Sequence, residues 1–271
     1  LLRQLKTVLA PVGKSEGEIF YRGMPLSGID HRTQSQEIGF VMQNPDNQIV
    51  TDKVWHELSF GLESLGYDNA TIRLRVAEMA SYFGIHQWFY KNVSELSGGQ
   101  KQILNLAAIM AMHPSLLILD EPTSQLDPIA ASDFLETVKK INRDIGTTVL
   151  LTEHRLQDII PYADRVFVMD KGNVYLEGTP REIGVKLKEQ KHGMFLSMPI
   201  PMQIYGETDS QATCPLTVSE GRQWLSRYCN EKGIASDSQR KSESTEKVRY
   251  TKTDSSKKEL SIQVKDVWFR Y

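Results

Sequence analysis

Cysteine is scarce in this sequence and long apolar runs are missing, and each shortage excludes a class of protein. Cys214 and Cys229 are the only cysteines, and their spacing fits no metal-binding motif, so free cytosolic thiols are expected instead of disulfides or a zinc site. No apolar run approaches the roughly 18 residues that span a bilayer, and we expect no secretory signal sequence. These shortages favour a soluble or peripheral protein.

Basic residues do not outnumber acidic residues in this sequence. Lys and Arg total 32 while Asp and Glu total 34, which gives a net charge of −2 and an isoelectric point near 6.4. This balance argues against a protein whose main partner is nucleic acid. The 271 residues are 40% hydrophobic, which is enough for a sizeable core in one or two domains.

The most informative stretch is residues 96–127, LSGGQKQILNLAAIMAMHPSLLILDEPTSQLD. Ser97, Gly98 and Gly99 come directly before a helical run, so their backbone N–H groups have no acceptor inside the helix, and the glycines let a phosphate come close. Residues 116–119 are apolar without alternation, as in a strand buried on both faces, and such strands deliver polar residues to the ligand-binding edge of a sheet. Each piece alone also fits an N-capped helix, or a core strand followed by two surface acids.

Together and in this order, the pieces resemble the signature motif, Walker B strand and D-loop of an ATP-binding cassette (ABC) ATPase. The resemblance implies an α/β fold of the P-loop NTPase type, with a RecA-like core and a helical subdomain. It also implies that Asp120 holds Mg²⁺, that Glu121 polarises the attacking water, and that Asp127 signals between two ATP sites. The residues that would bind an ATP shared with a second cassette are Ser97, Gly98, Gly99 and Gln100.

A second strand is predicted at residues 38–43, and its end resembles the Q-loop of the family. The resemblance implies that the side-chain oxygen of Gln43 reaches Mg²⁺ and the attacking water. The longer text QNPDNQIVTDKVWHELSFGLESLG resembles the energy-coupling factor (ECF) branch of ABC importers, in which QNP is followed by V-x-x-[DE]-x-x-FG. The alternative is an exposed polar loop before an ordinary helix. A further helix is predicted at residues 71–83, because apolar residues recur there on one face.

The run TTVLLT at residues 147–152 predicts another buried strand, which ends in Glu153 and His154. A histidine after a strand usually has no special role, but this one follows the acidic pair by one helix and one strand. It resembles the switch-region histidine (H-loop) of the family. The resemblance implies that His154 hydrogen-bonds the γ-phosphate and orients Glu121 and the water.

The P-loop of such an ATPase is not found in the sequence. Residues 1–5 (LLRQL) resemble the helix that follows a P-loop. The tripeptide GKS at residues 13–15 does not replace it, because Val8 stands where a P-loop needs glycine. We therefore interpret residues 1–186 as an ABC module that is incomplete at its N-terminus. The expectation is that this chain alone binds ATP poorly and does not hydrolyse it.

The composition changes after this module. Residues 187–258 are predicted to be a linker, partly disordered, with a short helix near 217–231. Residues 259–271 alternate as a strand and resemble the first strand of a second ABC module, in which Tyr271 would stack on adenine. The incomplete start and the new strand together suggest a segment of a polypeptide with two tandem modules.

The first functional hypothesis is an ECF-type import ATPase, with ATP and Mg²⁺, that couples ATP hydrolysis to uptake of a vitamin or metal ion. The resemblance implies integral membrane transport subunits and a second ABC module as partners, no nucleic acid, and a peripheral position at the cytoplasmic face of the membrane. Closure of two cassettes around ATP, and reopening after hydrolysis, would drive the membrane partner. Two alternatives stay open, a soluble tandem ABC protein that acts on ribosomes and a non-catalytic ABC half.

Overall fold

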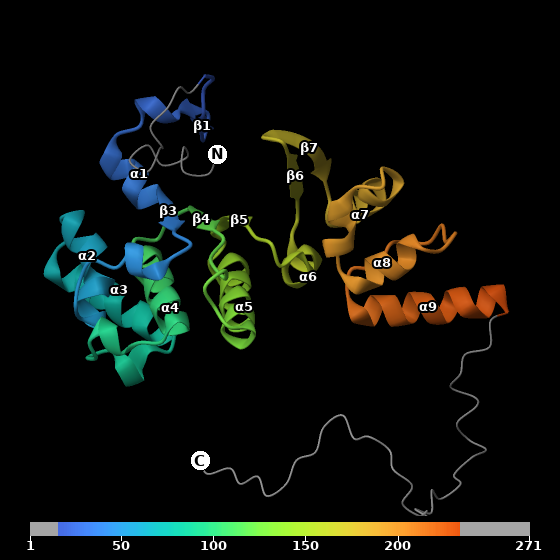
Figure 1. The fold of residues 1–271 in the computed structure, drawn as a ribbon. Helices are drawn as coiled ribbons and strands as arrows, with labels where there is room; N and C mark the ends of the chain where they lie inside the picture. The colour runs from blue at the N-terminus through green and yellow to red at the C-terminus, as the bar shows by residue number, and fades with distance from the viewer. Residues whose placement is uncertain (1–15, 234–271) are drawn as a thin grey trace, which may run out of the picture. The chain divides into compact units, whose positions relative to one another are not determined.

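The computed structural model describes residues 16–233, in which short strands and helices alternate (Figure 1). The chain divides into two compact units, residues 1–224 and 225–271. The strands of the described part are β1 (Phe20–Tyr21), β2 (Met24–Pro25), β3 (Ile38–Val41), β4 (Leu116–Asp120), β5 (Thr148–Thr152), β6 (Val166–Asp170) and β7 (Asn173–Gly178). Its α-helices are α1 (His31–Glu37), α2 (Val54–Ser64), α3 (Asn69–Tyr82), α4 (Gly98–Met110), α5 (Pro128–Ile145), α6 (Leu156–Ile159), α7 (Pro180–Glu189), α8 (Ile200–Gly206) and α9 (Val218–Lys232).

Several predicted features lie outside the described residues. They are the helix-like residues 1–5, the tripeptide at 13–15, the linker residues 234–258 and the strand at 259–271 with Tyr271. Across residues 16–233, none of the helices combines the length and the apolar character needed to cross a membrane.

A three-stranded parallel sheet in the order β3-β4-β5 lies in the first unit, and it confirms the three strands predicted there. Phe40 pairs with Ile118, which pairs in turn with Leu150, so the apolar runs lie side by side. β3 and the middle of β4 are buried, as their unbroken apolar sequence predicts. The prediction that β5 is buried is wrong. Its residues are half-buried or exposed, because among residues 16–233 only β4 pairs with it.

Helices α2, α3 and α4 pack against one another and form the helical part of the unit (Figure 1). Their shared core contains the fully buried side chains of Leu58 and Leu62 from α2 and Leu104 from α4. Helix α3 confirms the helix predicted at residues 71–83, and the carboxylate of Asp68 caps it by accepting from two backbone N–H groups of its first turn. Because α4 also contacts β3, the helical part is joined directly to the sheet.

Gly39 of β3 is expected to tolerate no side chain, because α4 lies directly over it. A Cβ atom here would stand 2.4 Å from Ile109 Cγ2 of α4 and 3.3 Å from Leu117 Cδ1. Ile109 is β-branched and stiff, so Gly39→Ala must displace the helix, and we expect it to lower the free energy of unfolding by about 1–3 kcal/mol. Denaturant titration measures the loss, with Gly28→Ala as the matched control, since no other heavy atom in the described part of the chain lies within 4 Å of a Cβ there. Equal stability of the two variants would contradict the close packing.

A second hydrophobic cluster joins the β6–β7 hairpin to α7 and α8. Its members include Val168 of β6, Leu187 of α7, Met202 of α8 and the thiol-bearing Cys214. Some apolar side chains of the predicted linker, among them Met202 and Cys214, thus share a buried cluster with Leu187 of α7. Burial raises the pKa of the Cys214 thiol to about 11, so the thiol stays protonated, and it is a free cysteine as expected.

The start of α9 is anchored to α7 by an ion pair. Arg181 Nη2 lies 3.1 Å from both carboxylate oxygens of Glu220, and one of these oxygens also accepts from Leu216 N at 2.8 Å. The backbone N–H of Glu220 donates to the Thr217 hydroxyl at 3.2 Å, which caps the helix. Helix α9 thus begins close to the helix predicted near 217–231, with its first turn tied to the folded module.

Candidate active site

Three neighbouring strands end at one edge of the parallel sheet, and polar residues follow each of them. Gln43 follows β3, Glu121 follows β4 and His154 follows β5. Gln43 Nε2 donates a hydrogen bond to Glu121 Oε2 at 3.1 Å, and His154 Nε2 lies 3.0 Å from Glu121 Oε1. The structure therefore brings together three residues that the sequence assigned to one site, with a single carboxylate held from two sides.

Glu121 adopts a backbone conformation that is rare for a residue with a side chain. Its φ is 47°, in the left-handed region. Two contacts hold it there, since its backbone N–H is directed to Thr152 O at 3.2 Å and to Thr152 Oγ1 at 3.1 Å. Backbone strain of this kind persists where the surroundings over-determine it, and it is concentrated at functional sites. The conformation carries the Glu121 carboxylate to the point where it meets both Gln43 and His154.

Asp120 is the last residue of β4, and Thr152 of β5 donates its hydroxyl to Asp120 Oδ1 at 3.1 Å. Because Gln43 turns its Nε2 toward Glu121, its amide oxygen is the atom available for a cation. Such oxygen donors fit Mg²⁺, which takes one or two protein ligands together with phosphate oxygens and water. Within residues 16–233, no group of three or more histidine, cysteine or acidic side chains is placed to hold a metal ion. Asp120 and Gln43 are the oxygen donors of this edge that would suit a Mg²⁺ whose other ligands are phosphate oxygens and water.

Ser97 is the N-cap of α4, as its position before two glycines predicts. Gln100 N donates to Ser97 Oγ at 3.3 Å and Ser97 N donates to Gln100 Oε1 at 2.9 Å, so the two residues form a capping box. Gln100, predicted to bind ATP, thus uses its side-chain oxygen in the helix cap. A Cβ at Gly99 would stand 3.1 Å from Ala130 Cβ, whereas at Gly98 no other heavy atom of residues 16–233 lies within 4 Å. Gly98 leaves the approach to the helix N-terminus open, which suits a phosphate.

Asp127 is the N-cap of α5. Its Oδ1 accepts from the backbone N–H groups of Ile129 and Ala130 at 3.0 Å each. Asp127 therefore has a structural role that the sequence analysis did not assign, beside the signalling role implied by the resemblance. Tyr271, the residue expected to stack on adenine, lies outside the described residues.

Two buried amide side chains of α4 join the loops of this site. Gln102 Nε2 donates to Met42 O at 3.2 Å and to Pro122 O at 3.1 Å, and Asn105 Nδ2 donates to Pro45 O at 3.2 Å. Neither Gln102 nor Asn105 was predicted from the sequence to belong to the site. The signal that points to them is a polar residue on the buried face of a helix, since a buried amide is costly unless it is hydrogen-bonded.

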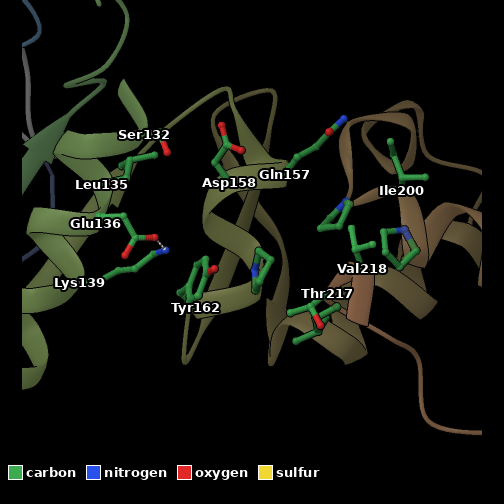
Figure 2. Close-up of a pocket in the computed structure, with 14 residues that line it drawn as sticks. Ser132, Leu135, Glu136, Lys139, Gln157, Asp158, Tyr162, Ile200, Thr217 and Val218 are labelled. Atoms are coloured by element: carbon green, nitrogen blue, oxygen red, sulfur yellow. Dashed lines mark hydrogen bonds and ion pairs between the residues drawn. The ribbon is translucent and has the colours of Figure 1, made fainter. Parts of the chain in front are cut away.

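Two pockets lie close to the H-loop but do not contain the carboxylates. One of about 340 Å³ lies between α5, residues 157–162 and the start of α9, and Figure 2 shows the side chains around it. The other, of about 360 Å³, is lined by His154 and Leu196 among others. Neither of these two pockets is lined by Asp120 or Glu121.

Known proteins resemble this chain in sequence and in fold. The profile of the ABC transporter family matches residues 1–124. The chain is 37% identical over 192 residues to the energy-coupling factor transporter ATP-binding protein EcfA1 of Clostridium perfringens, which covers 70% of this chain and 67% of that relative. The solved structure of CbiO1 from Clostridium perfringens, described as part of the ABC transporter complex CbiONQ, is 32% identical with a TM-score of 0.58, covering 70% of this chain and 76% of that one. The fold is therefore that of the ABC ATPase domains, which belong to the P-loop NTPase class.

The chain belongs to the ATP-binding proteins of ABC transporters. It is also 41% identical over 228 residues to an ABC transporter ATP-binding protein of Bacillus cereus, covering 84% of this chain and 41% of that relative. The chain thus spans less than half the length of the Bacillus relative. The predictions of the family and of the fold class are confirmed.

Proposed function

We propose that this chain supplies ATP-hydrolysing residues to an ECF-type ABC importer, which couples ATP hydrolysis to uptake of a vitamin or metal ion. The observation that carries the proposal is the hydrogen-bonded set of Gln43, Glu121 and His154 at the ends of three adjacent strands. Similarity to EcfA1 and to CbiO1 supports the ECF branch. The proposed partners are integral membrane subunits and a second ABC module, and the proposed position is peripheral, at the cytoplasmic face of the membrane.

In this proposal Glu121 accepts a proton from the water that attacks the γ-phosphate of ATP. Gln43 and His154 hold its two oxygens in one orientation, and the exposed ring of His154 is open to the phosphate. Mg²⁺, when bound with ATP beside Asp120 and Gln43, supplies positive charge against the phosphate oxygens. Because phosphoryl transfer depends on positioning and electrostatics, the contribution of this chain is a set of side chains already fixed by hydrogen bonds.

The N-terminus of α4 binds a different ATP in this proposal. The backbone N–H groups at this helix end, formed by Ser97, Gly98 and Gly99, face a nucleotide that is bound by the second module. Asp127 lies at the start of the neighbouring helix α5. The division into a module at 1–186, a linker and a second-module strand stays a prediction. So does the inactivity of the 271 residues by themselves.

Gly98→Ala is expected to lower ATP hydrolysis by the intact protein about tenfold without changing its stability. Among residues 16–233 the added methyl group meets no other heavy atom within 4 Å, and Gly98 has no positive φ, so alanine fits the helix. A loss of activity must then come from a nucleotide or partner that approaches the helix N-terminus. Steady-state hydrolysis and thermal unfolding measure the two effects, with Gly28→Ala as the control at an equally open position. Normal hydrolysis by Gly98→Ala would refute the role of this helix end.

The transport part is tested with the product of the whole gene and its membrane subunits in sealed vesicles. ATP-dependent uptake of labelled vitamins or divalent metal ions, lost in Glu121→Gln, is the expected result. Absence of uptake, together with co-purification with ribosomes, would replace this proposal by the soluble alternative.

A further inference from the structure

Glu153 stands between strand β5 and His154, and its carboxylate contacts two separate loops. Oε1 accepts from the backbone N–H of Thr123 at 3.2 Å and also from the Thr123 hydroxyl. Oε2 accepts from the backbone N–H of His154 at 2.9 Å, and the backbone N–H of Arg155 lies at 3.5 Å. One carboxylate thus joins the loop that follows Glu121 to the loop that carries His154.

The Thr123 end of this link is completely buried. Thr123 has no exposed surface, so its N–H and hydroxyl need protein partners, and Glu153 receives both. Thr123 also lies inside a tight turn, closed by the hydrogen bond from Ser124 N to Glu121 O at 3.2 Å. Holding Thr123 therefore holds the turn in which Glu121 keeps its positive φ.

At the other end of the link, the position of the His154 side chain depends on the position of its backbone. The His154 side chain is 83% exposed, so little packing restrains the imidazole. Its orientation toward Glu121, at 3.0 Å, is set by where the main chain of residues 153–155 lies. The hydrogen bond from His154 N to Glu153 Oε2 restrains that segment.

We propose that Glu153 is a positioning residue for ATP hydrolysis, whose carboxylate fixes the separation between Glu121 and His154. The inference rests on the proposed function above, because it concerns the same site. Thr152 holds the backbone of Glu121 against β5, and Glu153 holds the following turn against the H-loop. Together the two residues lock the ends of β4 and β5 to each other.

The chemistry of the link requires a carboxylate. The backbone N–H groups on both sides are donors that cannot turn round, and only a carboxylate accepts at both of its oxygens. Glu153→Gln keeps the length but presents an NH₂ group to one of the two loops, which leaves that loop without an acceptor. Glu153→Asp keeps both acceptors, but it is one methylene shorter and cannot reach both loops.

Glu153→Gln is expected to lower kcat for ATP hydrolysis about tenfold in the intact protein with its membrane subunits, with KM for ATP changed less than about twofold. Glu153→Asp is expected to fall between the wild type and Glu153→Gln. Thr123→Val, which removes the hydroxyl at similar volume, is expected to lower kcat as well. The double variant is expected to be no slower than Glu153→Gln alone, because both changes break the same link.

Each outcome decides between positioning and simple stabilisation. Additive losses in the double variant, or a lower melting temperature with kcat unchanged, would overturn the positioning role. Unchanged kcat in Glu153→Gln, while Glu121→Gln abolishes hydrolysis, would also overturn it and leave the proposed function intact. A wild-type protein without Glu121-dependent hydrolysis would refute the proposed function itself. Where Glu153→Gln does not fold, unchanged kcat in the milder Thr123→Val overturns the inference.

Discussion

Glu121→Gln is expected to slow ATP hydrolysis by the intact protein at least about a hundredfold while ATP binding persists. Glutamine has the size of glutamate, so the side chain still reaches Gln43 and His154, which lie 3.1 and 3.0 Å from the carboxylate oxygens. An amide, however, does not take a proton from water, so the reaction loses its base. Steady-state phosphate release measures the rate, and equilibrium binding of a fluorescent ATP analogue measures the affinity.

The control for this prediction is Glu136→Gln, the same substitution on the exposed side of α5. Glu136 pairs with Lys139 at 2.6 Å at the surface, where an ion pair contributes little. Hydrolysis at the wild-type rate is expected for this variant. If Glu121→Gln also hydrolysed ATP at the wild-type rate, the carboxylate would be only a structural partner of Gln43 and His154, and the proposed mechanism would fail.

The meeting of Gln43, Glu121 and His154 could be predicted because it depends on strand direction alone. Unbroken apolar runs identify buried parallel strands, and the carboxyl ends of adjacent parallel strands share one edge. Each functional residue follows such a run directly, so its place in the fold follows from its place in the sequence. The distances of 3.1 Å from Gln43 and 3.0 Å from His154 to the Glu121 carboxylate agree with that expectation.

Glu153 and residues 187–216 show what the sequence could not give. The link from Glu153 to Thr123 joins side chain and backbone across thirty positions, and such contacts leave no periodic pattern. The polar, proline-containing segment after residue 186 lacks a clear helical period, yet Met202 and Cys214 are buried against α7. Tertiary packing decides the conformation of such segments, because their local preference is weak. Asn105 stands among apolar neighbours in the sequence, but its partner, Pro45 O, is known only from the structure.

Phe134→Ala is expected to lower the free energy of unfolding by about 3–5 kcal/mol, the largest loss of stability predicted for this protein. Phe134 lies on α5, has no exposed surface and belongs to the core that α5 shares with α4 and β4. Removing the ring takes away its buried apolar area and leaves a cavity that the flanking helices fill only in part. Denaturant titration of the intact protein, followed by circular dichroism, measures the loss.

Ile129→Ala is the matched control, since this side chain lies on the same helix but is 76% exposed, and its loss is expected to change stability little.

The packing of α5 also affects the active site. Asp127 is the N-cap of α5, and Gly99 at the start of α4 lies directly beside Ala130 of α5. Loosening α5 at Phe134 should therefore loosen the contact between the start of α4 and the start of α5, and ATP hydrolysis should fall together with stability. If Phe134→Ala lowered the free energy of unfolding by less than about 1 kcal/mol, α5 would not be packed into this core. The position of Asp127 would then depend only on its hydrogen bonds to the first turn of α5.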